Sequence, residues 1–204
     1  MTTAAPLTSA TFPVIAIAAS AGGLSALTLL LSGLSPDLHA ALVIVQHLDP
    51  RHPSLMAEIL TRKSDLTVRQ AVEGDRLQPD TAFVAPPDHH MLVNPDGTLT
   101  LTQTELVHFV RPSADLLFES VAASFKDRVI AVVLTGTGQD GAMGVRAVHK
   151  MGGTVLAQDQ ASAEFFGMPQ AAIRTGCVDH IVPLSEIPAT LAQWVAQRAT
   201  HAKP

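Results

Sequence analysis

Three residues, Ser20, His47 and Asp140, are of the types that act together in nucleophilic catalysis. Ser20 follows the apolar run 14–19, His47 follows the run 41–46, and Asp140 ends a glycine-rich turn after a third apolar run. A serine hydroxyl attacks a carbonyl, an imidazole takes and returns its proton, and a carboxylate holds the imidazole in one tautomer. The pattern predicts Ser20 as nucleophile, His47 as base and Asp140 as orienting acid.

Each of these residues also has a structural interpretation. Ser20 and Asp140 precede predicted helices, where serine and aspartate are favoured as caps. His47 is one of nine histidines, and a solvated or structural histidine is common. The order Ser, His, Asp differs from the familiar serine-hydrolase orders, and the Gly-x-Ser-x-Gly elbow is absent. The three residues together therefore indicate a different family of hydrolases.

The surrounding elements decide whether these side chains meet. Short apolar runs rich in Val and Ile, separated by helical patterns, predict a doubly wound α/β fold with a mostly parallel sheet. Ligands bind at the carboxyl ends of such strands, where all three residues lie. We expect strands near 12–18, 41–46, 129–134, 154–157 and 178–182, and helices near 23–33, 53–62, 113–125, 140–151, 169–175 and 186–199.

The stretch 66–103 has a different pattern. Its apolar runs TAFVA, HMLVN and LTLT are linked by turn sequences rich in Pro, Asp, Asn and Gly. We interpret it as an antiparallel hairpin excursion near 81–103. Ser113 and Ser185 are predicted helix N-caps.

The composition limits the classes of function. Hydrophobic residues make up 47% of the chain and charged residues 15%, and the formal net charge is -5. This balance indicates a compact enzyme core and argues against a nucleic-acid partner. Apolar runs of six residues are far below the ~20 that span a bilayer, so we expect no membrane insertion. A single cysteine and an amino terminus without Lys or Arg predict a cytoplasmic protein.

At these residues the chain resembles the catalytic domain of the chemotaxis protein-glutamate methylesterases. The resemblance covers about 12–185 and is carried by VIAIAASAGGLSAL, IVQH, DTAFVAPPDHHM, RPSADLLFESVA, VVLTGTGQDGAMGV and LAQDQASAEFFGMPQAAIRTGCVDHIVPL. It implies hydrolysis of glutamate γ-methyl esters on chemoreceptors, with release of methanol and no metal or organic cofactor. By motif position, the family's nucleophile, base and acid fall on Ser20, His47 and Asp140.

Two positions depart from the family pattern. Ala21 replaces the threonine of Ser-Thr-Gly-Gly, and Thr137 replaces the methionine of Thr-Gly-Met-Gly, whose backbone is linked to the oxyanion hole. A backbone N–H survives a side-chain change, so we expect altered rate and unaltered chemistry. The candidates for the oxyanion hole and substrate cleft are Ala21, Gly22, Thr137, Gly138 and Met168.

We expect a single domain over 1–204, with frayed tails at 1–10 and 200–204. Few residues precede Phe12, too few for the receiver domain that typical family members carry, so a stand-alone domain with an uncovered cleft is expected. The partner implied is a methylated chemoreceptor, with a methyltransferase as a further candidate, and deamidation of receptor glutamines is a possible side activity. The alternatives are a catalytically silent receptor- or methyltransferase-binding module and a nucleotide-binding protein, although the Gly-x-Gly-x-x-Gly register is missing.

Overall fold

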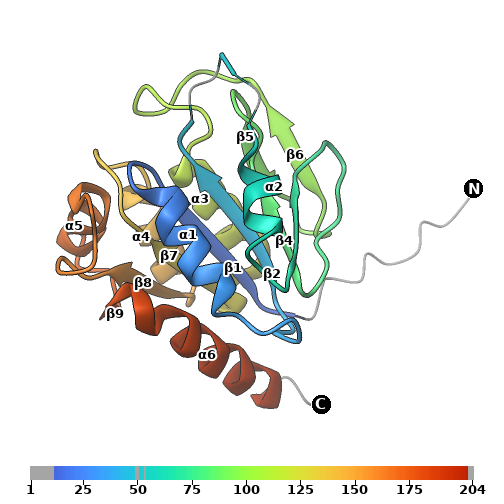
Figure 1. Cartoon of the computed structure of the whole chain (residues 1–204), viewed down its shortest axis with the longest axis vertical. Helices are drawn as coiled ribbons and strands as arrows, with labels where there is room; N and C mark the ends of the chain where they lie inside the picture. Colours follow the sequence, from blue (N-terminus) through green and yellow to red (C-terminus); the bar gives the residue numbers. More distant parts are fainter. Residues whose placement is uncertain (1–11, 49–50, 53, 202–204) are drawn as a thin grey trace, which may run out of the picture.

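A seven-stranded parallel sheet forms the centre of the molecule in the computed structural model, which describes residues 12–48, 51–52 and 54–201 (Figure 1). All neighbouring strands in it are parallel. In sheet order, the strands are β3 (Thr67–Gln70), β4 (Thr81–Val84), β2 (Ala41–Gln46), β1 (Val14–Ala19), β7 (Val129–Val133), β8 (Thr154–Gln158) and β9 (His180–Val182).

Helices cover both faces of this sheet. Every residue of β1, β2 and β7 is buried, which explains their unbroken apolar runs. One face packs against α1 (Gly23–Ser32), α2 (Met56–Thr61) and α6 (Ile187–His201). The other packs against α3 (Ala114–Phe125), α4 (Ala142–Lys150) and α5 (Gly167–Arg174). In Figure 1, α1 and α6 lie in front of the sheet, and α3 lies behind it. The doubly wound α/β class is confirmed.

The antiparallel part is smaller than the sequence suggested. Only β5 (His90–Val93) and β6 (Leu99–Thr102) pair antiparallel, as a separate two-stranded sheet. The segment 81–84, expected within the hairpin excursion, is instead β4 and pairs in parallel with both β2 and β3. All four of its residues are buried, as in an interior parallel strand, so the turn sequence after it leads out of the main sheet rather than back along it.

The predicted caps and tails have mixed outcomes. Ser113 is confirmed as the N-cap of α3. Ser185 is not a cap, because it lies inside the 3-10 turn Leu184–Glu186 that precedes α6. A second 3-10 turn, Lys126–Arg128, follows α3. Helix α6 includes residues 200 and 201, which were expected in a frayed tail; residues 1–10 and 202–204 lie outside the described part.

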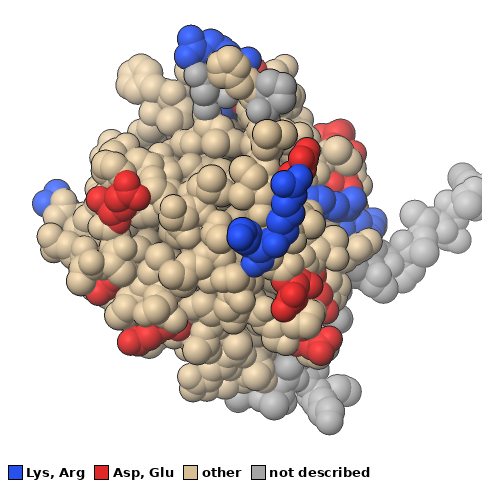
Figure 2. Space-filling model, in the orientation of Figure 1, with Lys and Arg blue, Asp and Glu red and all other residues tan. Residues whose placement is uncertain are grey.

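The sheet topology places two turns beside each other. From β1 the chain continues into β2 on one side, and it returns much later to β7 on the other. The turns after β1 and β7 therefore flank the point where strand order reverses, the usual crevice of a doubly wound sheet. No helix of the described residues is long and apolar enough to cross a membrane. On the face shown in Figure 2, acidic and basic groups are scattered among uncharged residues.

Candidate active site

Ser20 lies in the turn between β1 and α1. Its backbone N–H donates to the carbonyl of Thr135 (3.0 Å), and its carbonyl accepts from Gly23 N–H (2.8 Å). The N-cap of α1 is Gly22, at φ 74°, and no side chain caps this helix. The capping interpretation of Ser20 is therefore wrong, and the Ser20 hydroxyl is not used to satisfy the helix end.

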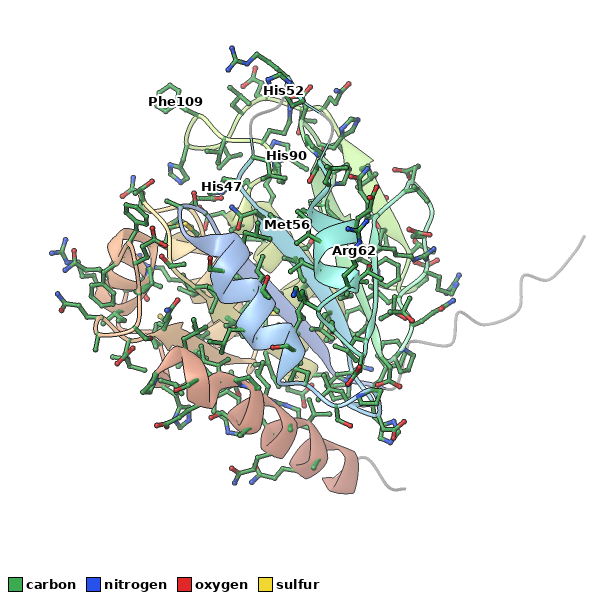
Figure 3. All side chains as sticks on the ribbon, in the orientation of Figure 1. His47, His52, Met56, Arg62, His90 and Phe109 are labelled. Atoms are coloured by element: carbon green, nitrogen blue, oxygen red, sulfur yellow. The ribbon has the colours of Figure 1, made fainter. Side chains whose placement is uncertain are left out.

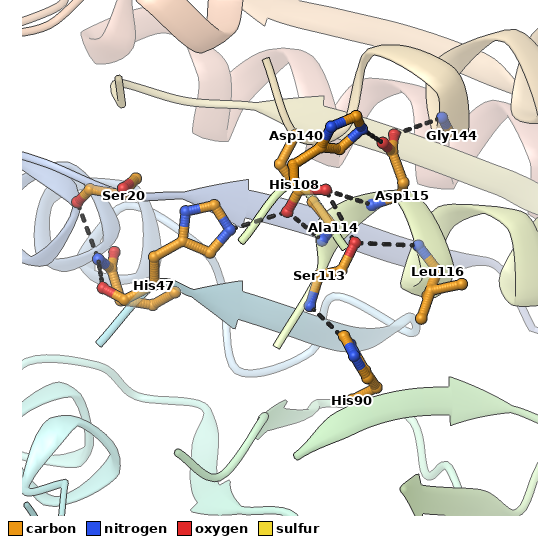
Figure 4. Close-up of polar contacts among 11 residues, drawn as sticks. Ser20, His47, His90, His108, Ser113, Ala114, Asp115, Leu116, Asp140 and Gly144 are labelled. Atoms are coloured by element: carbon orange, nitrogen blue, oxygen red, sulfur yellow. Dashed lines mark hydrogen bonds and ion pairs between the residues drawn. The ribbon is translucent and has the colours of Figure 1, made fainter. Parts of the chain in front are cut away.

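His47 follows β2 and lies between Ser20 and Asp140 (Figure 4). Its backbone N–H continues the strand pairing by donating to Ala19 (3.1 Å). Its Nε2 lies 2.8 Å from Oδ2 of Asp140, and the side chain is 13% exposed. Because Nε2 contacts the carboxylate, Nδ1 is the ring nitrogen that does not face Asp140.

Asp140 is the most tightly bonded of the three residues. Its Oδ1 accepts from Ser113 Oγ (2.8 Å) and from Asp115 N–H (3.1 Å). Its Oδ2 accepts from Ala114 N–H (2.6 Å) and contacts His47. Burial alone raises the pKa of this carboxyl, but the hydrogen bonds and the charge of His47 together lower that pKa below the ordinary aspartate value. Asp140 is thus held as a carboxylate aimed at the imidazole.

Asp140 does cap a helix, but not the one that follows it. The N-cap of α4 is Gly141, with no side-chain cap. The N–H groups that Asp140 accepts belong to the first turn of α3, whose positive dipole end favours a carboxylate. The predicted capping of its own helix is therefore wrong.

Behind Asp140, Ser113 connects it to a buried histidine. Ser113 Oγ donates to Asp140, and the backbone N–H of Ser113 donates to Nδ1 of His90 (3.1 Å). Nε2 of His90 donates to the carbonyl of Glu105 (3.0 Å). Because Nδ1 accepts and Nε2 donates, His90 is the neutral Nε2–H tautomer. His90 thus fixes the start of α3, whose backbone N–H groups donate to Asp140.

Asp115 completes the support from the first turn of α3. Its Oδ1 accepts from the N–H of Gly144 in α4 (2.7 Å), and its Oδ2 contacts Nε2 of His108 (3.1 Å). Burial raises the pKa of the Asp115 carboxyl and the nearby charge of Asp140 adds to the rise, against the Gly144 hydrogen bond and the charge of His108. A Cβ on Gly144 would lie 2.5 Å from Phe118 Cβ, so only glycine permits this close contact between α3 and α4.

Four of the five oxyanion candidates offer backbone donors. Among the described residues, four backbone N–H groups donate to no protein acceptor: those of Ala21, Gly22, Thr137 and Gly138. The Thr137 and Gly138 positions are exposed, and the Ala21 and Gly22 positions are half-buried. These N–H groups border the two turns that flank the crevice.

Met168 has a different role from the other candidates. Its backbone N–H donates to the carbonyl of Gly136 (2.9 Å), and its side chain is buried. A Cβ on Gly136 would lie 2.3 Å from Met168 Sδ and 2.8 Å from Ser20 Cβ. Met168 therefore packs under the turn after β7, and Gly136 allows that turn to approach Ser20.

Two buried glutamines at strand ends brace the crevice. Gln46, the last residue of β2, donates from Nε2 to the carbonyls of Ser20 (2.8 Å) and His47 (3.0 Å). Gln158, the last residue of β8, accepts from the backbone N–H of Thr135 (2.8 Å). Sequence patterns carry no signal for either role, because a glutamine at a strand end has no characteristic partner. The sequence predicts Ser113 only as a helix cap, and His90 lies in the HMLVN run of the predicted hairpin.

Two hollows are lined by His47 or by one of the oxyanion-hole candidates. The smaller, of about 150 Å³, is lined by His47, Leu48, Asp88, Leu106, Phe109, Val110 and Arg111. The larger, of about 460 Å³, is lined by His108, Phe109, Gly138, Gln139, Gly167, Gln170, Ala171 and Arg174. A third of about 490 Å³ lies away from the three predicted residues and is lined by Asp127, Arg128, Thr154, His180, Trp194, Gln197 and Arg198. In the described part of the chain, no cluster of three or more His, Cys, Asp or Glu residues is placed to hold a metal ion.

Known proteins resemble this chain closely. A family model described as CheB methylesterase matches residues 15–191. A protein named protein-glutamate methylesterase/protein-glutamine glutaminase 1 from Burkholderia lata is 44% identical over 88% of this chain and 54% of its own length. A relative from Pyrococcus horikoshii, named as a methylesterase/glutaminase of the same kind, is 41% identical over 89% of this chain and 50% of its own.

The structural comparison agrees. The crystal structure of the Thermotoga maritima CheB methylesterase catalytic domain superposes with a TM-score of 0.86 at 33% identity, covering 90% of this chain and 98% of that one. The chain spans about half the length of the curated relatives it matches. With the family model covering most of its length, the chain belongs to the CheB methylesterase family.

Proposed function

We propose that this chain is a serine esterase that hydrolyses glutamate γ-methyl esters on a methylated chemoreceptor, giving glutamate and methanol. The observation that carries the proposal is the 2.8 Å contact between His47 Nε2 and a buried, ionised Asp140. It leaves Nδ1 of the same ring for the Ser20 hydroxyl, at the strand-order reversal where α/β enzymes bind their substrates.

The mechanism follows from these positions. Ser20 Oγ attacks the ester carbonyl while His47 Nδ1 takes its proton, and Asp140 stabilises the imidazolium that forms. Backbone N–H groups among Ala21, Gly22, Thr137 and Gly138 stabilise the oxyanion. His47 then protonates the departing methoxide as methanol. A water molecule, deprotonated by His47, hydrolyses the acyl-enzyme and releases the glutamate side chain.

The same residues suit a second reaction. The names of the relatives join methylesterase with protein-glutamine glutaminase, and a triad that expels methoxide also expels ammonia when His47 protonates the leaving nitrogen. We include deamidation of receptor glutamines as a second activity. An enzyme that methylates glutamate must supply the ester, so a methyltransferase acts on the same receptor. The cytoplasmic location stays a prediction from composition.

Methanol release from membranes that contain methylated receptor tests the proposal. The purified chain should release methanol, Ser20→Ala should lower the rate by several orders of magnitude, and a fluorophosphonate probe should label the parent but not the variant. Ser25→Ala, at an exposed serine in α1, is the matched control and should behave as the parent. A folded parent that neither labels nor releases methanol would instead support a silent binding module.

A further inference from the structure

A short hairpin with a two-residue turn lies beside His47 and exposes a phenylalanine, Phe109. Val107 and Val110 pair through two backbone hydrogen bonds of 3.2 and 2.9 Å, and the two residues between them, His108 and Phe109, have φ values of 50° and 64°. Such turns normally contain Asn or Gly, because other residues are strained there. Phe109 is 94% exposed, so its ring does not offset that strain by packing in the fold.

Polar contacts hold this hairpin in place. Arg111 donates to the Asp88 carboxylate (2.6 and 2.9 Å) and to the carbonyls of Gln103 (3.1 Å) and Thr104 (2.6 Å). The side chain of His108 contacts Asp115 of α3. Phe109 is therefore presented on a fixed support, which reduces the entropy lost when a partner binds it.

The position of Phe109 connects it to the candidate site. Phe109 lines both the hollow that contains His47 and the larger hollow that contains Gly138. Figure 3 shows its ring projecting outward on the same side of the molecule as His47. Leu106, 53% exposed, adds apolar surface in the smaller hollow. Because Phe109 shares the hollow with His47, we expect a protein segment that delivers an ester to His47 to contact this ring, and a small free ester to react without that contact.

The charged residues that line the larger hollow indicate the charge of the partner that binds there. Arg174, at the end of α5, lines it together with the neutral groups of Gly138, Gln139 and Gln170, and no carboxylate of the described residues does. This lining fits a segment that carries negative charge. A protein substrate whose methylated glutamates have unmethylated neighbours supplies carboxylates next to the ester.

We propose that Phe109 and Arg174, which both line the larger hollow, form the docking site for the substrate protein. Phe109 packs against an apolar side chain of that protein, and Arg174 pairs with a carboxylate near the ester. This inference rests on the proposed function and names the surface through which that function selects a protein substrate.

The test compares a protein substrate with a small ester. Phe109→Ala should raise KM for methylated receptor about 10-fold or more, yet hydrolyse p-nitrophenyl acetate as the parent does. Phe109→Trp should restore most of the affinity. Arg174→Gln should raise KM for the receptor and weaken its dependence on salt. Ile181→Ala, at an exposed apolar residue of β9, should change neither reaction.

A binding measurement separates this inference from the proposed function. In the Ser20→Ala background, cosedimentation with methylated receptor membranes should be weakened by Phe109→Ala and retained by Phe109→Trp. The inference is overturned if Phe109→Ala leaves receptor KM and cosedimentation unchanged, or if it slows both substrates equally. A parent that hydrolyses neither substrate but cosediments through Phe109 would overturn the proposed function alone.

Discussion

Replacing Gly23 by alanine should break the two hydrogen bonds that Gln46 donates to the carbonyls of Ser20 and His47. Oε1 of Gln46 is buried, has no hydrogen-bond partner among the residues that the structure describes, and faces Gly23. A Cβ at position 23 would lie 1.9 Å from that oxygen and 2.9 Å from Ala19 Cβ. Gln46 must then move, and its Nε2 must leave the carbonyls of Ser20 and His47.

The size of the effect follows from these contacts. Two lost hydrogen bonds cost ~1 kcal/mol each, and inserting a methyl group into a packed site costs ~1–3 kcal/mol. Allowing for relaxation, we expect the free energy of unfolding to fall by ~2–4 kcal/mol. At ~2–4 °C per kcal/mol for a domain of this size, Tm falls by ~5–15 °C. Displacing Ser20 from His47 by ~1 Å costs on the order of 10²-fold in kcat/KM.

Thermal unfolding and hydrolysis of p-nitrophenyl acetate measure the two effects. Gly176→Ala is the control for adding a methyl group where there is room, because a Cβ there meets nothing within 4 Å; its φ is positive (72°), unlike that of Gly23. It should cost ~1 kcal/mol in stability and leave kcat/KM unchanged.

A double variant separates the clash from the brace. Gly23→Ala with Gln46→Ala removes the clashing oxygen but keeps the close contact with Ala19 Cβ. Adding Gly23→Ala to Gln46→Ala should therefore lower stability by less than Gly23→Ala does alone, while kcat/KM stays low because the two hydrogen bonds of Gln46 are absent. Strict additivity of the two stability losses, or parent-like kcat/KM for Gly23→Ala, would refute the reasoning.

Three further predictions concern the surrounding network. Ser113→Ala removes the N-cap of α3 and a donor to Asp140, and should lower the free energy of unfolding by ~1–2 kcal/mol and kcat by ~10- to 100-fold; urea unfolding and esterase assays check this, with Ser113→Thr as the variant that keeps the hydroxyl. Burial raises the pKa of Asp115 in the folded state. The protonated carboxyl therefore contributes stability at pH values below the ordinary aspartate pKa, and this contribution is lost as the pH rises through the raised pKa. Asp115→Asn should therefore gain stability relative to the parent in urea unfolding between pH 4 and 7, and a pH-independent difference would contradict this. Thr137→Met and Ala21→Thr should change turnover by well under the ~10²-fold that loss of an oxyanion donor costs, since both keep their backbone N–H.

The placement of Ser20 and His47 at strand ends could be predicted because buried strands are visible in the sequence. Each fully buried strand is an unbroken apolar run, so the residues following β1 and β2 identify Ser20 and His47 directly. The family motifs support the same positions. The hairpin prediction for segment 81–84 is wrong. The Pro and Asp after it favour a turn, but its burial on both faces, which only packing decides, places it in the main sheet.

Other features depend on contacts between distant segments. The turn at His108 and Phe109 contains no Asn or Gly, so no local signal predicted its positive φ values. Gln46 and Gln158 act on neighbouring strands through side-chain amides. Such contacts follow from sheet order, which apolar patterns alone did not determine.

The exchange of caps between α3 and α4 explains how a carboxylate stays charged in this site. Asp140 precedes α4 but accepts from the first turn of α3, and Asp115 in that turn accepts from Gly144 of α4. Each helix start thus receives its carboxylate from the other, and α3 offsets the cost of burying Asp140 before any substrate arrives. The orientation of His47 therefore depends on how closely α3 and α4 pack. Because Gly144 has no room for a side chain, a change at that contact should act on catalysis through Asp140 as well as on stability.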